Sequence, residues 1–390
     1  MNYIFSSGTA RGGTALTTRM LSVNEEVEIA LDPYLPLYKS FRNAIAEKSG
    51  LFKFISENPI SDYYHSNNGM VLLDEILNAK LDINFPKNNK LDLITSLKNR
   101  SLLSSGDITA HIEKLDLDGS IGDAFESALS LIKNLRKPKA TWIGIHENWT
   151  VEFLKPLAHH FNDAKFLITL RDPRAVICSS LNVKNISERG QILSYSRGLR
   201  KLMACAYHFR SLPIFKKRLK VVRHEDVVED PEKICKEMCD FLNIEFKKEM
   251  LDTDNFVEAS DGSIYNGISS FEKEAKGISQ HRATRWRKYL RKDHQQLIEF
   301  LCGPEMNLFG YKTDFNLISK EQIGEVISCL EDDIRNQKVN WRTDTGNLSL
   351  EIGSEIRRWV LSQSTFSQNG LVDRSMFLFD TVKSGILEKK

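Results

Sequence analysis

The sequence predicts an α/β fold in which a parallel β-sheet is flanked by helices. Short apolar runs that suit strands alternate with segments of helical periodicity, the first run leads directly into a glycine-rich loop, and later runs end in charged residues. Alternating strands and helices are typical of parallel sheets, whose ligands bind at the carboxyl ends of the strands. We therefore expect functional residues in the segments that directly follow the strands.

Five segments have the length and apolar character of strands, namely residues 3–5, 27–31, 142–145, 165–170 and 219–223. Helices are expected between them. The first follows the glycine-rich loop and carries Leu16, Met20 and Leu21 on one face. Another is expected from Thr150. A third begins at Asp230-Pro231, where a capping residue precedes a proline in the first helical position.

Two regions depart from the alternation of strands and helices. Residues 34–140 contain helical stretches, such as 123–135, and no clear strand, so we expect a helical insertion over the active edge of the sheet. Residues 315–390 are also expected to be helical, and Ser319-Lys320-Glu321-Gln322 matches a capping box. The predicted organisation is a catalytic domain, 1–314, followed by a helical C-terminal extension. The sequence leaves open whether this extension is a dimer interface, a lid or a scaffold.

The composition limits the classes of partner. The chain has 390 residues and a net charge of +2, from 54 Lys and Arg against 52 Asp and Glu, so it lacks the basic field of a nucleic-acid-binding protein. It has no apolar run of about 18 residues, and its start lacks the features of a secretory signal, so we expect no membrane partner. Six scattered Cys without a CxxC motif predict reduced thiols in a cytoplasmic protein without a metal site.

The first candidate anion site is the loop from Ser6 to Ala15, which contains three glycines between a strand and a helix. Consecutive backbone N–H groups and a helix N-terminus form a cradle for phosphate, although an ordinary glycine-rich turn is the alternative. Gly8 and Gly13 have the Walker A spacing, but Thr14 stands where that motif requires Lys. The cation lies inside the loop instead, as Arg11.

The second candidate site follows the strand at 165–170. Arg171 begins an Arg-Asp-Pro-Arg segment, and Ser179 lies eight residues further on, on the expected next helix. A guanidinium group combined with a hydroxyl suits a dianionic phosphate. The alternative is that Arg171 pairs with Asp172 or caps a helix.

The third candidate site is the basic segment 280–292. Half of residues 281–292 are Lys or Arg, and Trp286 lies among them. An aromatic ring among guanidinium groups suits a phosphate beside a base. A solvated basic helix face is the alternative, and the nearly neutral chain argues against a large nucleic-acid footprint.

Together these motifs resemble the PAPS-dependent sulfotransferase family, where PAPS is 3′-phosphoadenosine 5′-phosphosulfate. Residues 7–14 resemble the family's 5′-phosphosulfate loop, and residues 171–179 resemble its 3′-phosphate motif. Residues 222–231 are similar to the segment R-Y-E-D-L-x-x-D-P, with His224 where Tyr is usual. Residues 282–290 resemble the late basic segment, and 307–311 the end of the catalytic domain. Ala15 and Leu16 replace the family's frequent Thr and Trp.

The resemblance implies a P-loop-like sulfotransferase fold and transfer of a sulfuryl group from PAPS, with 3′-phosphoadenosine 5′-phosphate as product and no metal. Arg11 and the loop amides would stabilise the leaving phosphate. The residues that it implies for nucleotide binding are Arg11, Gly12, Gly13, Thr14, Ala15, Leu16, Arg171, Ser179, His224, Arg282, Arg285, Trp286 and Arg287.

The acceptor must lose a proton, so the resemblance also implies a base near the sulfur. Asp32 ends the second strand and is the first candidate, although it also suits a turn before Pro33. His146 and Glu147 follow, and a structural histidine is the alternative for His146. The sequence does not decide among the three.

The sequence does not name the acceptor. We expect a hydroxyl or amine of a soluble small molecule or glycan. Two other functions are kept: a P-loop-type kinase or nucleotide hydrolase, which magnesium dependence would reveal, and a non-catalytic nucleotide-binding protein. The oligomeric state is open, and a homodimer is one alternative.

Overall fold

The fold was analysed in a computed structural model. It describes residues 1–55, 62–85, 90–102, 105–182, 192–258, 262–265, 277–314, 320–335, 348–363 and 373–388.

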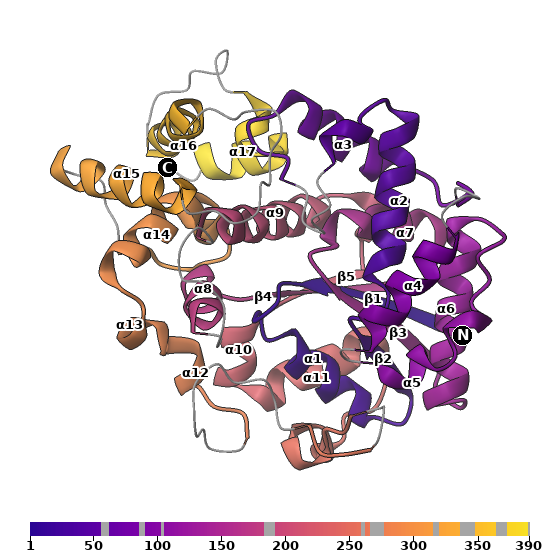
Figure 1. Ribbon diagram of the computed structural model, residues 1–390. Coiled ribbons are helices and arrows are strands. Elements are labelled where there is room, and N and C mark those ends of the chain that lie inside the picture. Colours follow the sequence, from indigo (N-terminus) through magenta and orange to yellow (C-terminus); the bar gives the residue numbers. More distant parts are fainter. Residues whose placement is uncertain are drawn as a thin grey trace.

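A five-stranded parallel sheet, in the order β2-β3-β1-β4-β5, forms the centre of the protein (Figure 1). Its strands are β1 (Asn2–Gly8), β2 (Val27–Leu31), β3 (Trp142–Asn148), β4 (Lys165–Leu170) and β5 (Leu219–Arg223). All five predicted strands are therefore confirmed, as is the α/β class. The parallel arrangement requires a crossover between successive strands, and helices supply it.

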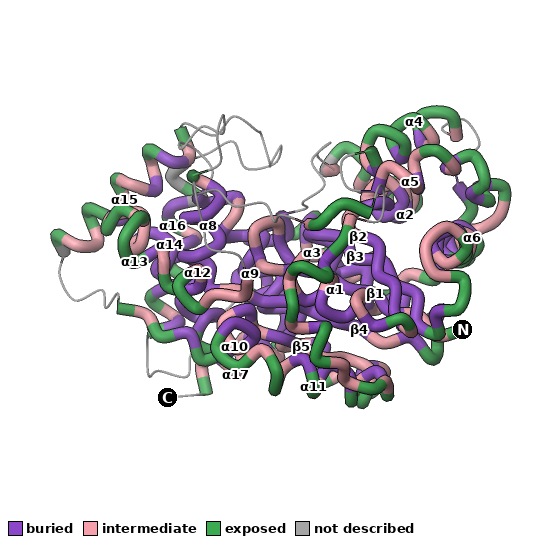
Figure 2. The backbone as a smooth tube through the Cα atoms, turned by 90° about the horizontal axis from the view of Figure 1, so that it is seen from below, coloured by how far each residue is buried: buried purple, intermediate pink, exposed green. Residues whose placement is uncertain are grey.

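Both faces of the sheet are buried. Side chains alternate along a strand, so Ile4 belongs to one hydrophobic cluster and Phe5 to another on the opposite face. The Ile4 cluster includes Met20 of α1 (Thr14–Val23) and Met238 of α11 (Pro231–Leu242). Figure 2 shows the strands and α9 (Ile192–Arg210) as a largely buried layer beneath more exposed outer helices.

The carboxyl ends of β1, β2 and β3 meet at one edge of the sheet. His146 of β3 is in register with Ser6 of β1 and with Leu31 of β2. Non-glycine residues with positive φ follow each strand, namely Arg11 (65°), Asp32 (50°) and Trp149 (69°). Strained backbone of this kind is typical of functional sites.

The region 34–140 is helical in its described residues, as expected. Its α-helices are α2 (Leu35–Lys48), α3 (Asn67–Asn78), α4 (Lys90–Ser101), α5 (Gly106–Thr109) and α6 (Ile121–Arg136). The predicted stretch 123–135 is α6, and Ser120 and Asp123 form a capping box at its start.

The other helices follow the predicted order along the chain. The segment after Thr150 forms a 3₁₀ turn and then α7 (Leu154–His160), and Asp230 caps α11 by accepting a hydrogen bond from the Lys233 N–H. The remaining helices up to residue 314 are α8 (Pro173–Leu181), α10 (His224–Glu229), α12 (His281–Thr284), α13 (Trp286–Tyr289) and α14 (Lys292–Leu308).

The C-terminal extension forms α15 (Lys320–Arg335), α16 (Leu348–Gln363) and α17 (Asp380–Leu387), which pack against α9 and α14 (Figure 1). Ser319, the predicted cap of α15, lies outside the described residues. Leu330, Trp359 and Phe377 belong to the same hydrophobic cluster as Phe5 of the sheet. The extension therefore shares its core with the rest of the protein.

A buried ionic cluster also joins the extension to α9. Glu355 of α16 lies 3.0 Å from Arg197 and 2.9 Å from Arg200, and its Oε1 is 3.1 Å from Nε2 of His65. Burial by itself would raise the pKa of Glu355, but Arg200, His65 and Arg197 outweigh it and hold the pKa well below its usual 4.5. The carboxylate therefore stays ionised inside the protein.

None of the helices in these ranges is both long enough and apolar enough to cross a membrane. The expected cytoplasmic location stays a prediction.

We predict that Glu355→Gln lowers the free energy of unfolding by about 3–5 kcal/mol at neutral pH, because it leaves buried arginines without their carboxylate. A group with a depressed folded-state pKa stabilises the protein above its ordinary pKa, and this contribution is lost as the pH falls through the folded value. The wild-type should therefore lose stability below about pH 4.5 more steeply than the variant. Urea denaturation across this pH range measures both effects.

Glu331→Gln is the matched control, because Glu331 forms an exposed pair with Arg335 on α15. Such pairs contribute about 0.3–0.5 kcal/mol. Equal losses in the two variants would show that Glu355 does not hold the extension in place.

Candidate active site

The glycine-rich loop closes tightly against the start of α10. Gly13 is the N-cap of α1 and has a φ of 83°, which favours glycine. A Cβ atom at this position would lie 2.2 Å from Nδ1 of His224. Glycine at this position therefore allows the loop to contact His224. The loop leads directly into α1.

Arg11 connects this loop to the second motif. Its Nε donates a hydrogen bond to Oγ of Ser179 on α8, at 3.0 Å. Burial lowers the pKa of Arg11, and nearby Arg285 lowers it further against the opposing effect of Tyr265 and Tyr195. The loop and the Arg171 segment are therefore in direct contact, as a shared anion site requires.

Arg171 connects two of the motifs through hydrogen bonds. Its guanidinium donates to the carbonyl oxygen of Arg11 at 2.8 Å and to that of Arg282 at 2.7 Å. Of the two sequence alternatives for this segment, the helix cap forms, because Asp172 is the N-cap of α8 and accepts a hydrogen bond from the Arg174 N–H at 2.9 Å. The pair between Arg171 and Asp172 does not form. Asp172 binds the guanidinium of Arg174 instead, with its Oδ2 at 2.7 Å from NH2.

Several buried polar atoms of these motifs fit an anionic ligand. Oγ1 of Thr9, Nε of Arg171 and Nδ1 of His224 lie buried without a hydrogen-bond partner among the described residues. Burial lowers the pKa of His224 well below 6.5, and Arg171 and Arg282 lower it further, so this imidazole is neutral. Native proteins rarely leave such atoms unpaired, so a bound group that accepts and donates hydrogen bonds would complete this site.

The late basic segment divides into two parts. The carbonyl of Arg282 lies at the site through its bond to Arg171, and Arg285 is close enough to lower the pKa of Arg11. Trp286 is only 3% exposed and packs against α8, with the guanidinium groups of Arg174 and Arg287 over its ring at 4.0 and 4.6 Å. The ring therefore packs against α8, and two guanidinium groups lie over it.

Sequence reasoning missed the residues that orient α8. Glu225 accepts hydrogen bonds from the Asp172 N–H at 3.0 Å and from the Tyr311 hydroxyl at 2.9 Å. Glu299 of α14 pairs with Arg174 at 2.7 Å. Glu225 follows His224 within a recognisable segment, so the signal for it was present, whereas Glu299 lies in a helix without a motif.

The three candidate bases lie at the carboxyl ends of β2 and β3. Asp32 follows β2, and both of its carboxylate oxygens accept hydrogen bonds from Nδ2 of Asn148, at 3.0 and 2.9 Å. NH2 of Arg100 lies 3.1 Å from Oδ1 of Asp32 and 3.3 Å from Oε2 of Glu147. Sequence reasoning missed Arg100 and Asn148. Asn148 ends β3, three residues beyond the predicted strand 142–145.

The other two candidate bases are inaccessible. His146 is buried, its Nδ1 lies 3.0 Å from Oγ of Ser6, and burial lowers its pKa although Asp32 opposes this. Glu147 is also buried, accepts a hydrogen bond from the Tyr34 N–H, and has a pKa raised well above 4.5 by burial and by Asp32. Asp32 differs, because 23% of its side chain is exposed.

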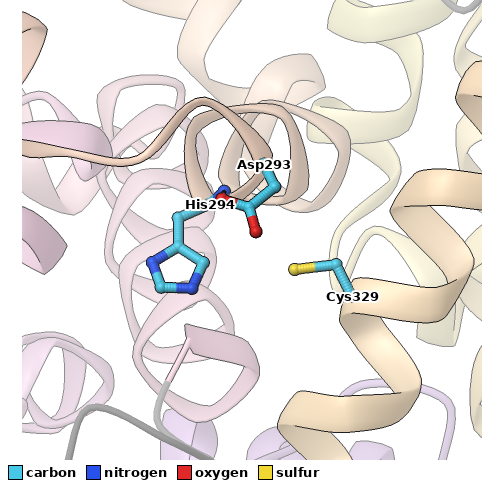
Figure 3. A group of neighbouring side chains, drawn as sticks. All are labelled: Asp293, His294 and Cys329. Atoms are coloured by element: carbon cyan, nitrogen blue, oxygen red, sulfur yellow. Dashed lines mark hydrogen bonds between the residues drawn. The ribbon is translucent and has the colours of Figure 1, made fainter.

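One cluster with metal-ligand chemistry lies elsewhere in the described residues. Figure 3 shows Asp293 and His294 at the start of α14, with Cys329 approaching from α15. Their ligand atoms lie within 4.8 Å of one another. Asp293 already accepts hydrogen bonds from the guanidinium of Arg291, so its carboxylate is engaged.

Comparison with curated proteins finds similar chains in several animals. The chain is 29% identical over 184 residues to carbohydrate sulfotransferase 3 of Tetronarce californica, covering 42% of this chain and 39% of that protein. It is 29% identical over 182 residues to carbohydrate sulfotransferase 3 of Homo sapiens, covering 42% of this chain and 36% of that protein. The matched part is thus less than half the length of these relatives.

Among solved structures, the sulfotransferase domain from the curacin biosynthetic pathway aligns with 80% of this chain and 98% of its own, at 15% identity and a TM-score of 0.46. A model of the sulfotransferase family matches residues 4–248. This range includes the glycine-rich loop, the Arg171 segment, and Asp32 with its neighbours Arg100, Glu147 and Asn148. The chain therefore belongs to the sulfotransferase family.

Proposed function

We propose that this protein transfers the sulfuryl group of PAPS to a hydroxyl or amine of a small-molecule or glycan acceptor. The observation that carries the proposal is the contact of Arg11 with Ser179 and of Arg171 with the Arg11 carbonyl, which joins two separate anion motifs. The acceptor oxygen or nitrogen would form a bond to sulfur as the bond from sulfur to the phosphate oxygen breaks. The acceptor proton would pass to a base of the protein, and 3′-phosphoadenosine 5′-phosphate would leave.

Arg11 would stabilise the negative charge that grows on the leaving phosphate. It lies in the loop before α1, where the helix N-terminus favours an anion. The N–H groups of Gly12 and Leu16 already donate to carbonyls within this loop, so the donors to phosphate would come from residues 13–15. Preorganised donors of this kind contribute about 3–4 kcal/mol each to the stabilisation of a transition state. The rate enhancement would therefore depend on the loop and its cation.

The 3′-phosphate would bind between the loop and α8. Ser179 offers a hydroxyl, and the Nε–H of Arg171 is a donor without a partner among the described residues. The other hydrogen bonds of Arg171 go to the backbone carbonyls of Arg11 and Arg282. This arginine would therefore both bind phosphate and fix the distance between the motifs.

Asp32 would act as the base on the acceptor side. Its partial exposure favours it over His146 and Glu147, which an acceptor could reach only after rearrangement of the buried edge. The other two would then be structural: His146 through its contact with Ser6, and Glu147 through the Tyr34 N–H.

A carbohydrate acceptor is supported by the names of the curated relatives. The family match also favours transfer of a sulfuryl group over the kinase, hydrolase and non-catalytic alternatives. The compartment and the oligomeric state stay predictions.

The proposed activity is tested with labelled PAPS and a panel of unsulfated oligosaccharides and phenols. We expect the mass of a product to increase by one SO₃ group, without a need for magnesium. Arg11→Ala should lower kcat about 10²-fold, because it removes the cation beside the leaving oxygen. Arg335→Ala on the exposed face of α15 is the control and should retain activity. Unchanged kcat in Arg11→Ala would remove Arg11 from the mechanism.

Ser179→Ala should weaken binding of 3′-phosphoadenosine 5′-phosphate about tenfold, because a hydrogen bond to a charged group contributes about 1.5–3 kcal/mol. Binding of adenosine 5′-phosphate, which lacks the 3′-phosphate, should change little. Isothermal titration calorimetry with both nucleotides measures the difference. Equal losses for the two ligands would show that Ser179 does not contact the 3′-phosphate.

Asp32→Asn should abolish most turnover and leave nucleotide affinity unchanged, because the amide cannot take the acceptor proton. The measurements are steady-state transfer rates and calorimetric titration with 3′-phosphoadenosine 5′-phosphate. If His146→Ala has this effect and Asp32→Asn does not, the base is His146.

A further inference from the structure

Arg100 comes from the helical insertion, yet it reaches the sheet edge where the acceptor would react. Its NH2 group lies 3.1 Å from Oδ1 of Asp32 and 3.3 Å from Oε2 of Glu147. The Arg100 side chain is 24% exposed and Asp32 is 23% exposed, whereas Glu147 is fully buried. Arg100 thus bridges an accessible carboxylate and a buried carboxyl group.

The start of α5 contacts both the end of β2 and the end of α4, which carries Arg100. Oγ of Ser105, the N-cap of α5, donates to the carbonyl of Leu31, the residue before Asp32, at 3.1 Å. Oγ of Ser101 lies 2.6 Å from Oγ1 of Thr109, which ties α4 to α5. Arg100 also lies in the last turn of α4, where a helix stabilises positive charge. The cation is therefore held beside the end of β2 by contacts on both sides.

The charges around Arg100 come from three elements. Asp32 follows β2, His146 and Glu147 lie on β3, and the Tyr34 N–H at the start of α2 donates to Glu147. Burial would lower the pKa of Arg100, but Glu147 and Asp32 outweigh it and raise the pKa. Because the pKa of Glu147 is raised and that of His146 is lowered, Arg100 is the permanent cation of this cluster.

We propose that Arg100 is a positioning residue for sulfuryl transfer, which holds the carboxyl group of Asp32 in place at the end of β2. The inference rests on the proposed function, in which Asp32 accepts the acceptor proton. Asn148 already fixes both oxygens of Asp32 but carries no charge. Arg100 supplies the charge, so the insertion contributes to proton removal as well as covering the edge of the sheet.

The test compares kcat and the acceptor KM in wild-type, Arg100→Gln and Arg100→Lys, with labelled PAPS and the panel of unsulfated oligosaccharides and phenols. Arg100→Gln should lower kcat about tenfold and leave KM unchanged, because Asp32 loses the charged partner that fixes its orientation. Arg100→Lys should recover most of kcat. Affinity for 3′-phosphoadenosine 5′-phosphate should not change in either variant.

A double mutant separates action through Asp32 from a general loss of structure. In the Asp32→Asn background, Arg100→Gln should lower the residual rate far less than it does in the wild-type, because the two effects are not additive when one residue acts through the other. Arg136→Gln is the control, since Arg136 holds Asp107 in the same insertion. It should lower the Tm and leave kcat unchanged.

The outcomes distinguish this inference from the function on which it rests. If wild-type protein transfers nothing to any acceptor of the panel, the proposed function fails, and this inference with it. If wild-type is active and the kcat of Arg100→Gln is unchanged, or the double mutant shows additive losses, only the role of Arg100 is overturned.

Discussion

The hydrogen bonds of the Arg171 guanidinium hold the glycine-rich loop and the late basic segment together. A buried guanidinium must find acceptors, and Arg171 finds them in the backbone carbonyls of Arg11 and Arg282. Carbonyls cannot rotate away as side chains do, so this interaction fixes the glycine-rich loop relative to the late basic segment. With the loop held in this position, Nε of Arg11 donates its hydrogen bond to Oγ of Ser179.

The order of the strands divides the chemistry of the site into two sides. β1 lies between β3 and β4, and its loop carries Arg11. Arg171, which follows β4, is on one side of this loop, and Asp32 and Glu147, at the ends of β2 and β3, are on the other. In the proposed function, phosphate would bind on the side of Arg171 and the acceptor proton would be removed on the side of Asp32. Both sides combine charges of opposite sign. Glu225 and Asp172 lie near Arg171, and Arg100 lies beside Asp32.

Local patterns were enough to predict the strands, the loop and the Arg171 segment. They failed where a contact depends on how distant elements dock. Asp172 suited a pair with its neighbour Arg171, but it binds Arg174, which lies two residues further on and also meets Glu299. Arg100 carries no motif. It reaches Asp32 because α4 packs against α5, whose N-cap Ser105 contacts the end of β2. The assignment of Trp286 to the ligand stays a prediction, and the sequence does not reveal that its ring packs against α8.

The cluster around Glu355 has a consequence for the order in which the chain matures. The carboxylate that Arg197 and Arg200 share lies 155–158 residues further along the chain, on α16. Until α16 has been synthesised, both arginines lack one of the carboxylates that make their burial tolerable. The nascent chain must therefore keep this part of α9 partly hydrated until α16 docks against it.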